Sequence, residues 1–364
     1  MLLISITLLY GVFAFLGIYL IWSEKSIRVS VPISESVSVI VALRDEDKNI
    51  NRLVNGLIRQ KYPLQIEYIF VDDNSSDETL NLLNEWALKD NRIRVLSSVG
   101  DGKKSCIAAA IKIASNPIII QTDADCEMGE YWIMSSVNKL LSSKNDLILG
   151  PVYPFQTKTI LNGLIRLEWL AMQFITVLTS RLKSAGMANG ANLTFYKKDY
   201  EDFSISKYGE AYASGDDMFF MRFLQKKGKQ VSFNLDKQAI VRTEMPVSFK
   251  GLLQQRIRWA TKAGKTTNAL TYFFTFLVVL VNFAWIGALF SFLENINYLF
   301  IFCVSASSKL ITDFFICLNM ARFYNDYKVL YLLPLMFLLY PIYILTGVIF
   351  SFRKSYEWKE RLLH

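Results

Sequence analysis

The stretch Pro117-Ile118-Ile119-Ile120-Gln121-Thr122-Asp123-Ala124-Asp125-Cys126 joins an apolar run to two carboxylates that are two residues apart. The apolar run is typical of a buried β-strand, so the carboxylates should lie at its carboxyl end, where open α/β sheets place their ligands. Asp residues at i and i+2 can share one hard divalent cation and leave coordination positions for phosphate oxygens. Asp-x-Asp also occurs in solvated turns, so this pattern alone does not distinguish a turn from a metal-binding site, and evidence from the rest of the chain is needed.

The composition indicates a chain with both a soluble part and a membrane part. It has 364 residues, of which 52% are hydrophobic and 20% are charged. That is too apolar for one soluble domain and too charged for a membrane bundle alone. The net charge of +8 is compatible with nucleic acid, but basic residues beside apolar segments are more typical of the cytoplasmic side of a membrane. We therefore expect a membrane partner and no nucleic acid.

The numbers and positions of histidine and cysteine exclude several kinds of active site. The one histidine is His364, which leaves no residue for histidine zinc sites or for Ser-His and Cys-His nucleophile pairs. The four cysteines show neither zinc spacing nor a disulfide framework. Any acid–base catalysis therefore falls to carboxylates.

Apolar segments of spanning length lie at both ends of the chain. Residues 1–22 are interpreted as a retained transmembrane anchor, because they lack a basic start and a small-residue cleavage site. Lys25 and Arg28 follow, so the positive-inside rule places a catalytic domain at 23–265 in the cytoplasm. About three more transmembrane helices are expected within 266–352, before a basic tail at 353–364. The expected location is the cell membrane, with several spans.

The C-terminal segments leave one conflict open. Three crossings from the cytoplasm would place the basic tail outside, so either one segment does not fully cross or the tail is external. The middle segment contains Lys309 and Asp313, one helical turn apart. This segment is therefore the one suspected of not fully crossing. Ionisable residues in lipid usually pair or face a polar cavity, so we expect the two to pair with each other, and a role toward a substrate is the alternative.

Between the anchor and these segments, short β-branched runs alternate with helical stretches, which is typical of a mostly parallel α/β sheet. Strands are expected at 37–42, 66–71 and 93–96, and polar loops leave their carboxyl ends at 43–47, 72–79 and 100–105. The acidic pair of the second loop suits either a ribose or base contact or the cap of the next helix. The lysine pair of the third loop suits either a phosphate or solvent.

Two further motifs follow, Ser214-Gly215-Asp216-Asp217 and Gln255-Arg256-Ile257-Arg258-Trp259. The acidic loops, the Gly-Lys loop, Asp-x-Asp and these two motifs follow one another along the chain. With this order of motifs, residues 36–265 resemble the family 2 glycosyltransferases. The resemblance implies a GT-A fold with a mixed, mostly parallel sheet that binds a nucleotide sugar and a divalent metal. Gly215 is a departure, because many members have Glu there.

The resemblance also implies roles for single residues. Asp123 and Asp125 are expected to hold Mg²⁺ or Mn²⁺, which would stabilise the diphosphate leaving group. Asp216 is expected to be the catalytic base, with Asp217 as the alternative. The residues expected to bind the nucleotide sugar are Arg44, Glu46, Asp72, Asp73, Lys104, Asp123, Asn189, Gly190, Asn192, Gln255, Arg258 and Trp259.

Two amphipathic stretches of the domain, near 160–182 and 248–264, are expected at the membrane surface. The apolar core of the first, from Trp169 to Leu178, is judged too short to span, and a core helix of the domain is the alternative.

With the apolar segments, the resemblance implies a membrane-bound, inverting, metal-dependent hexosyltransferase, and UDP is the expected donor nucleotide by analogy with the family. The acceptor is expected to be a lipid, as in ceramide glucosyltransferases, or a growing polysaccharide, as in cellulose and hyaluronan synthases. Because Gly215 departs from the family pattern, a catalytically inactive nucleotide-binding scaffold in the membrane is the remaining alternative.

Overall fold

The computed structural model describes residues 1–23, 32–97, 102–142, 144–206, 208, 215–266, 268–351, 356–358 and 361–363. The chain divides into two compact units. The helical unit comprises Met1–Ser26, Gln156–Gly186 and Met245–His364, and the sheet unit comprises Ile27–Phe155 and Met187–Glu244. Several residues used in the sequence predictions lie outside the described residues: Lys25, Arg28, Gly100, Asp101, Ser214, Arg353, Lys354 and Lys359.

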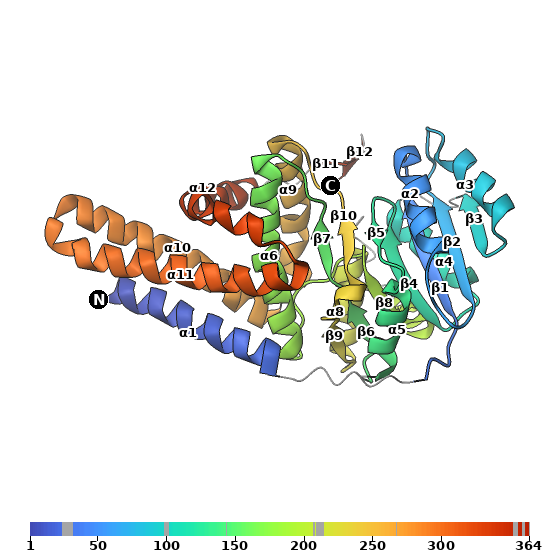
Figure 1. Cartoon of the computed structure of the whole chain (residues 1–364), viewed down its shortest axis with the longest axis horizontal. Coiled ribbons are helices and arrows are strands. Elements are labelled where there is room, and N and C mark those ends of the chain that lie inside the picture. The colour runs from blue at the N-terminus through green and yellow to red at the C-terminus, as the bar shows by residue number, and fades with distance from the viewer. Residues whose placement is uncertain are drawn as a thin grey trace. The chain divides into compact units, whose positions relative to one another are not determined.

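The sheet unit is built on a sheet that has seven strands within the described residues, in the order β3-β2-β1-β4-β8-β6-β9 (Figure 1). Strand β8 is antiparallel to β4 and β6, and the other neighbouring pairs are parallel. The predicted mixed, mostly parallel α/β sheet is therefore confirmed. The strands are β1 (Val37–Leu43), β2 (Ile66–Asp72), β3 (Ile93–Ser97), β4 (Ile118–Asp123), β6 (Leu147–Leu149), β8 (Leu193–Tyr196) and β9 (Val231–Phe233).

Apolar residues at strand and helix spacing form the core of this unit. Strand β1 is buried over almost its whole length, as expected for a parallel strand that is covered on both faces. Helix α2 buries Ile50, Leu53, Val54 and Leu57, which recur on one helical face. The helices of the unit are α2 (Asp47–Ile58), α3 (Thr79–Lys89), α4 (Lys103–Ile113), α5 (Trp132–Ser142), α7 (Lys197–Ile205) and α8 (Asp216–Lys226), with the 3₁₀ turn η1 (Lys237–Ala239).

A second, smaller sheet of the sheet unit has the order β5-β10-β7. Its strands are β5 (Glu127–Met128), β7 (Val152–Pro154) and β10 (Val241–Thr243). Because β5 follows β4 directly, the pairing of β10 with β5 brings Thr243 beside the Asp-x-Asp stretch.

The helical unit contains five helices, within the described part of the chain, that are long and apolar enough to cross a membrane. They are α1 (Leu2–Ser23), α6 (Ile160–Arg181), α10 (Ala269–Glu294), α11 (Leu299–Tyr324) with its preceding turn η2 (Ile296–Tyr298), and α12 (Leu333–Ser351) with its preceding turn η3 (Tyr327–Leu332). The unit also holds α9 (Phe249–Thr266) and the hairpin of β11 (Tyr356–Trp358) and β12 (Arg361–Leu363).

Helix α6 differs from the sequence prediction of a short apolar core. It runs for 22 residues without a break and reaches spanning length. Its charged residues have partners inside the unit: Arg166 is ion-paired with Asp326, and Glu168 with Arg256. Both α6 and α9 group with the long helices, so the compact units divide the chain differently from the expected domain at 23–265.

The predicted pair within the middle C-terminal segment is confirmed. Lys309 Nζ lies 2.5 Å from Asp313 Oδ2 on α11, and the Lys309 side chain is 2% exposed. The hydroxyl of Tyr10 on α1 donates a hydrogen bond of 2.8 Å to Asp313 Oδ1. The pair therefore also ties α1 to α11.

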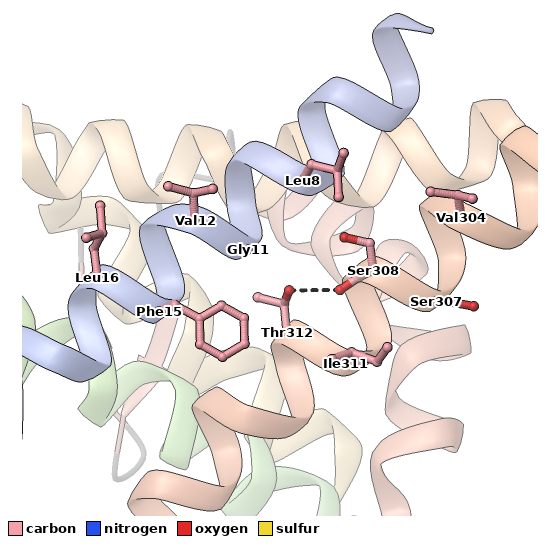
Figure 2. Close-up of a pocket in the computed structure, with 10 residues that line it drawn as sticks. All are labelled: Leu8, Gly11, Val12, Phe15, Leu16, Val304, Ser307, Ser308, Ile311 and Thr312. Atoms are coloured by element: carbon pink, nitrogen blue, oxygen red, sulfur yellow. Dashed lines mark hydrogen bonds between the residues drawn. The ribbon is translucent and has the colours of Figure 1, made fainter.

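An apolar groove of about 780 Å³ lies between α1 and α11 (Figure 2). Two hydroxyl groups of the groove donate hydrogen bonds to backbone carbonyls of the same unit: Ser308 donates to the carbonyl of Thr7, and Thr312 donates to the carbonyl of Ser308. The walls are mostly aliphatic and aromatic side chains, among them Leu8, Val12 and Phe15. The groove is therefore a predominantly apolar surface.

Candidate active site

The loops that leave β1 and β2 are joined to each other at the carboxyl edge of the sheet. The backbone N–H of Asp45 donates to Ser75 Oγ at 2.9 Å, and that of Glu46 donates to Thr79 Oγ1 at 2.8 Å. Asp45 Oδ1 accepts a bond of 2.7 Å from the N–H of Ser76. The structure thus joins the loops that carry the predicted residues, as expected for the carboxyl ends of neighbouring parallel strands.

Asp72 and Asp73 are buried in this edge, with exposed fractions of 3% and 2%. One oxygen of each accepts a backbone hydrogen bond: Asp72 from Ser75 at 3.1 Å and Asp73 from Gly102 at 2.9 Å. The other oxygens, Asp72 Oδ1 and Asp73 Oδ2, have no hydrogen-bond partner among the described residues. Buried carboxylate oxygens need donors, which a water molecule or a ligand could supply here.

The alternative role of this pair, capping the next helix, is wrong. The N-cap of α3 is Glu78, which makes no side-chain capping bond. The backbone N–H of Thr79 at the start of α3 donates instead to Asp77 Oδ1. Asp72 and Asp73 are thus not needed to start the helix.

Two lysines at the start of α4 meet two different carboxylates. The ammonium group of Lys103 is ion-paired with Asp123 Oδ1. That of Lys104, the predicted residue, lies 3.9 Å from Asp216 Oδ1. Sequence reasoning named the lysine pair but did not select Lys103, because the side of α4 that each residue occupies depends on how the helix packs.

Asp123 and Asp125 lie at the end of β4, as predicted. Asp125 Oδ2 accepts a hydrogen bond of 3.2 Å from Thr243 Oγ1, and its backbone carbonyl accepts one of 3.1 Å from Arg52. Burial raises the pKa of Asp125 to about 6, and the negative charges of Asp123 and Glu46 add to this shift. A cation beside the pair would relieve this repulsion.

These residues fit Mg²⁺ or Mn²⁺. Both ions prefer oxygen ligands, and Mg²⁺ is commonly held by one or two carboxylates together with phosphate oxygens. Within the described residues there is no group of three or more His, Cys, Asp or Glu side chains that could hold a metal alone. A metal here would therefore take its remaining ligands from substrate and water.

Asp216 is the first residue of α8, after Gly215, whose φ of 92° is a left-handed conformation that glycine adopts without strain. Its Oδ2 accepts a hydrogen bond of 2.5 Å from the hydroxyl of Tyr200. Burial raises the pKa of Asp216 to about 6, although Tyr200 and Lys104 lower it. A carboxylate with such a pKa is suited to general-base catalysis near neutral pH. Tyr200 carried no signal in the sequence.

The loop before β8 contacts Asp217. The backbone N–H of Gly190 donates to Asp217 Oδ2 at 3.0 Å. A Cβ at Gly190 would lie 2.8 Å from Gln121 Nε2 and 3.5 Å from Lys103 Nζ, so a larger residue would require the Gln121 side-chain amide to shift. Gly190 is thus brought together with the predicted charged cluster, while the side chain of Asn189 accepts from the N–H of Ala191.

Asn192 has a different position from that expected of a sugar ligand. Its side chain is 1% exposed. Its Nδ2 donates to the carbonyls of Pro151 and Ala239 at 3.0 and 2.9 Å, and its Oδ1 accepts from Trp132 at 3.0 Å. These bonds join separate segments of the sheet unit, so we leave Asn192 out of the proposed donor site.

Gln255, Arg258 and Trp259 lie on α9 of the helical unit. The buried cation of this motif is Arg256, which sequence reasoning did not select. Its Nη2 lies 2.5 Å from Glu168 Oε2, and its guanidinium lies 4.4 Å from the centre of the Trp259 ring. The roles of Gln255, Arg258 and Trp259 at a donor stay predictions.

Residues 38–203 match the glycosyl transferase family 2. This stretch covers the strands β1 to β8 and both carboxylates of the Asp-x-Asp stretch. Over these residues, a little less than half of its length, the chain is therefore similar to the family 2 glycosyltransferases.

Curated relatives share parts of this domain. The beta-monoglucosyldiacylglycerol synthase of Trichormus variabilis is 30% identical over 118 residues, which cover 31% of this chain and 25% of that protein. The undecaprenyl-phosphate 4-deoxy-4-formamido-L-arabinose transferase of Proteus mirabilis is 33% identical over 95 residues, which cover 25% of this chain and 29% of that protein. The matched stretches thus span less than a third of either relative.

A solved structure is similar over nearly the whole chain. The mannosyltransferase PcManGT from Pyrobaculum calidifontis, in complex with GDP-Man and Mn²⁺, matches with a TM-score of 0.53 and 14% identity. The match covers 96% of this chain and 98% of that one. At this identity the likeness shows the shared GT-A-like fold.

Proposed function

We propose, from the similarity to the family 2 glycosyltransferases, that this protein is a membrane-bound inverting hexosyltransferase that moves a sugar from a UDP-sugar to a lipid acceptor. The observation that carries the proposal is the charged cluster at the carboxyl edge of the sheet. There, Asp123 and Asp216 each lie beside one lysine of α4. Asp72 and Asp73, in the loop after β2, each have one carboxylate oxygen that finds no hydrogen-bond donor among the described residues.

The nucleotide end of the donor is assigned to the loops after β1 and β2. Asp72 Oδ1 and Asp73 Oδ2 would accept hydrogen bonds from the base or the ribose hydroxyls, which are donors of the right kind. Lys103 and Lys104 and the N-terminus of α4 would bind the diphosphate, because helix N-termini and ammonium groups both favour anions. UDP is the expected nucleotide by resemblance to the family.

Asp123 and Asp125 would hold the divalent cation, which supplies charge stabilisation for the leaving diphosphate. Thr243 and Arg52 keep the Asp125 segment in place through their hydrogen bonds. Glu46 adds negative charge to the same edge.

Asp216 would accept the proton of the acceptor hydroxyl as its oxygen attacks the anomeric carbon. The new glycosidic bond forms while the bond from that carbon to the diphosphate oxygen breaks, and the electron pair leaves with the diphosphate. Attack opposite the leaving group inverts the anomeric configuration. Tyr200 and Lys104 hold the Asp216 carboxylate in place.

A lipid acceptor is supported by two observations. Among the residues that the structure describes, five helices of the helical unit could cross a membrane. The two relatives named above act, by their names, on diacylglycerol and undecaprenyl-phosphate lipids. A processive polysaccharide synthase is the second candidate, and an inactive scaffold with the Gly215 departure is the third.

The test is transfer from labelled UDP-sugars by the full-length protein in lipid and detergent, with Mn²⁺ or Mg²⁺. A single glycolipid product is expected, whereas a ladder of lengths would favour the polysaccharide synthase. Asp216→Asn should lower turnover by about 10²- to 10⁴-fold. Asp123→Ala and Asp125→Ala should abolish metal-dependent transfer and keep the circular dichroism spectrum. Absence of turnover by the wild type with every nucleotide sugar would favour the scaffold.

A further inference from the structure

The ion pair between Lys103 and Asp123 joins the first residue of α4 to the last residue of β4. Both side chains remain partly exposed, at 37% and 29%, so neither is locked into the core. The carboxylate that is expected to hold the divalent cation thus already has a cation of the protein beside it.

The surroundings of Lys103 also belong to the expected donor site. A Cβ at Gly190 would lie 3.5 Å from Lys103 Nζ and 3.8 Å from Asp217 Oδ2. The ammonium group therefore lies against the backbone of the loop that binds Asp217, between carboxylates at the end of β4 and at the start of α8. Lys103 pairs with Asp123, and Lys104 lies beside Asp216.

We propose that Lys103 is a resident counter-ion of the metal site, which pairs with Asp123 in the resting protein and leaves it for the donor diphosphate when the metal–nucleotide complex enters. This inference rests on the proposed function, because it assigns Asp123 to the metal. It predicts that a free divalent cation binds weakly, since it must displace an ammonium group, and that nucleotide diphosphate strengthens metal binding by giving this group a new partner. Lys103 thereby couples the two ligands.

The experiment measures Mn²⁺ binding to the full-length protein from the electron paramagnetic resonance signal of free Mn²⁺. Lys103→Met should tighten Mn²⁺ binding by about fivefold, the range expected for removing one partner of a partly exposed ion pair. Lys103→Arg keeps the charge and should bind Mn²⁺ as the wild type does. Lys104→Met is the matched control, and it should change Mn²⁺ affinity less than twofold because its partner is Asp216. Unchanged or weaker Mn²⁺ binding by Lys103→Met would overturn the proposal.

A second measurement repeats the titration with UDP. In the wild type UDP should strengthen Mn²⁺ binding, and in Lys103→Met this gain should be smaller; an equal gain in both would contradict the coupling. Neither titration needs turnover. A protein that transfers no sugar but responds to Lys103→Met would refute the proposed function alone, whereas an active enzyme that does not respond would refute the counter-ion alone.

Discussion

The hydroxyl of Tyr200 donates a hydrogen bond of 2.5 Å to Oδ2 of Asp216. Tyr200 is buried, with an exposed fraction of 3%, and its ring packs on Phe195 and Phe220, so the hydroxyl is held in position. The carboxylate of the expected base is thereby oriented by a residue of α7 and by Lys104 of α4.

The first prediction concerns the pH dependence of transfer. Asp216 must be ionised to accept a proton, so activity should fall as the pH falls through its pKa of about 6. Tyr200→Phe removes a hydrogen bond to the charged form, which should raise that pKa and move the acid limb of kcat/KM upward by about half to one pH unit. Tyr196→Phe, a control in the same unit, should leave the limb in place. A profile that does not move would show that Tyr200 has no influence on the ionisation of the base.

The second prediction concerns how the ionisation of Asp216 changes the free energy of unfolding of the protein. Its folded pKa, about 6, is above the value of an unfolded aspartate, so the native protein binds this proton more tightly than the unfolded chain does. The contribution of Asp216 to the free energy of unfolding is therefore fully present at low pH and is lost as the pH rises through about 6. Asp216→Asn cannot ionise and should be more stable than the wild type at pH 8, by about 3 kcal/mol for a pKa raised from 3.8 to about 6.

Thermal unfolding of the full-length protein at pH 5 and pH 8 checks this. The midpoint difference between Asp216→Asn and the wild type should be larger at pH 8 than at pH 5. A variant that is less stable at both values would mean that the bonds from Tyr200 and Lys104 outweigh the burial of the charge.

The third prediction separates two neighbouring asparagines. Asn192→Ala removes three buried hydrogen bonds and leaves the Trp132 N–H without its partner, so it should lower the free energy of unfolding by about 2–3 kcal/mol. Asn189→Ala removes one local bond and should have a much smaller effect on stability. Unfolding midpoints of the two variants, measured side by side, give the comparison. Equal midpoints would contradict the structural role of Asn192.

The local part of the site could be predicted from the sequence. The apolar run before Asp123 and Asp125 lies next to them in the chain, so strand and strand-end carboxylates could be recognised together. The same holds for Asp72 at the end of β2 and for Asp216 after Gly215. Other residues reach the site only because segments that are distant in the sequence pack together, and no local pattern marks them. Lys103 meets Asp123 because α4 packs on β1 and β2, and Tyr200 of α7 meets Asp216 of α8 because these two helices pack on each other. Neither meeting can be read from the periodicity of a single segment.

The membrane part illustrates the same limit. The pair of Lys309 and Asp313 was predictable because both residues lie on one helix, four positions apart. The length of α6 was not, because Arg166 and Glu168 lie just before the apolar run that begins at Trp169, and the sequence does not show that they pair with Asp326 and Arg256. A charged residue does not mark the end of an apolar helix when a residue of opposite charge on another segment pairs with it.

The last prediction tests the pair of Glu168 and Arg256. The two side chains are 9% and 12% exposed and lie 2.5 Å apart, and Tyr343 accepts a further hydrogen bond of 2.6 Å from Arg256. Removing one partner leaves a buried charge, so Glu168→Gln and Arg256→Met should each lower stability by about 3 kcal/mol, whereas the double variant should lose less than the sum. Unfolding midpoints of the wild type, both single variants and the double variant form the cycle. Since Arg256 also lies over the Trp259 ring, Arg256→Met should in addition release α9, which protease cleavage near Gln255 would report. Additive losses in the double variant would mean that the pair does not hold α6 and α9 together.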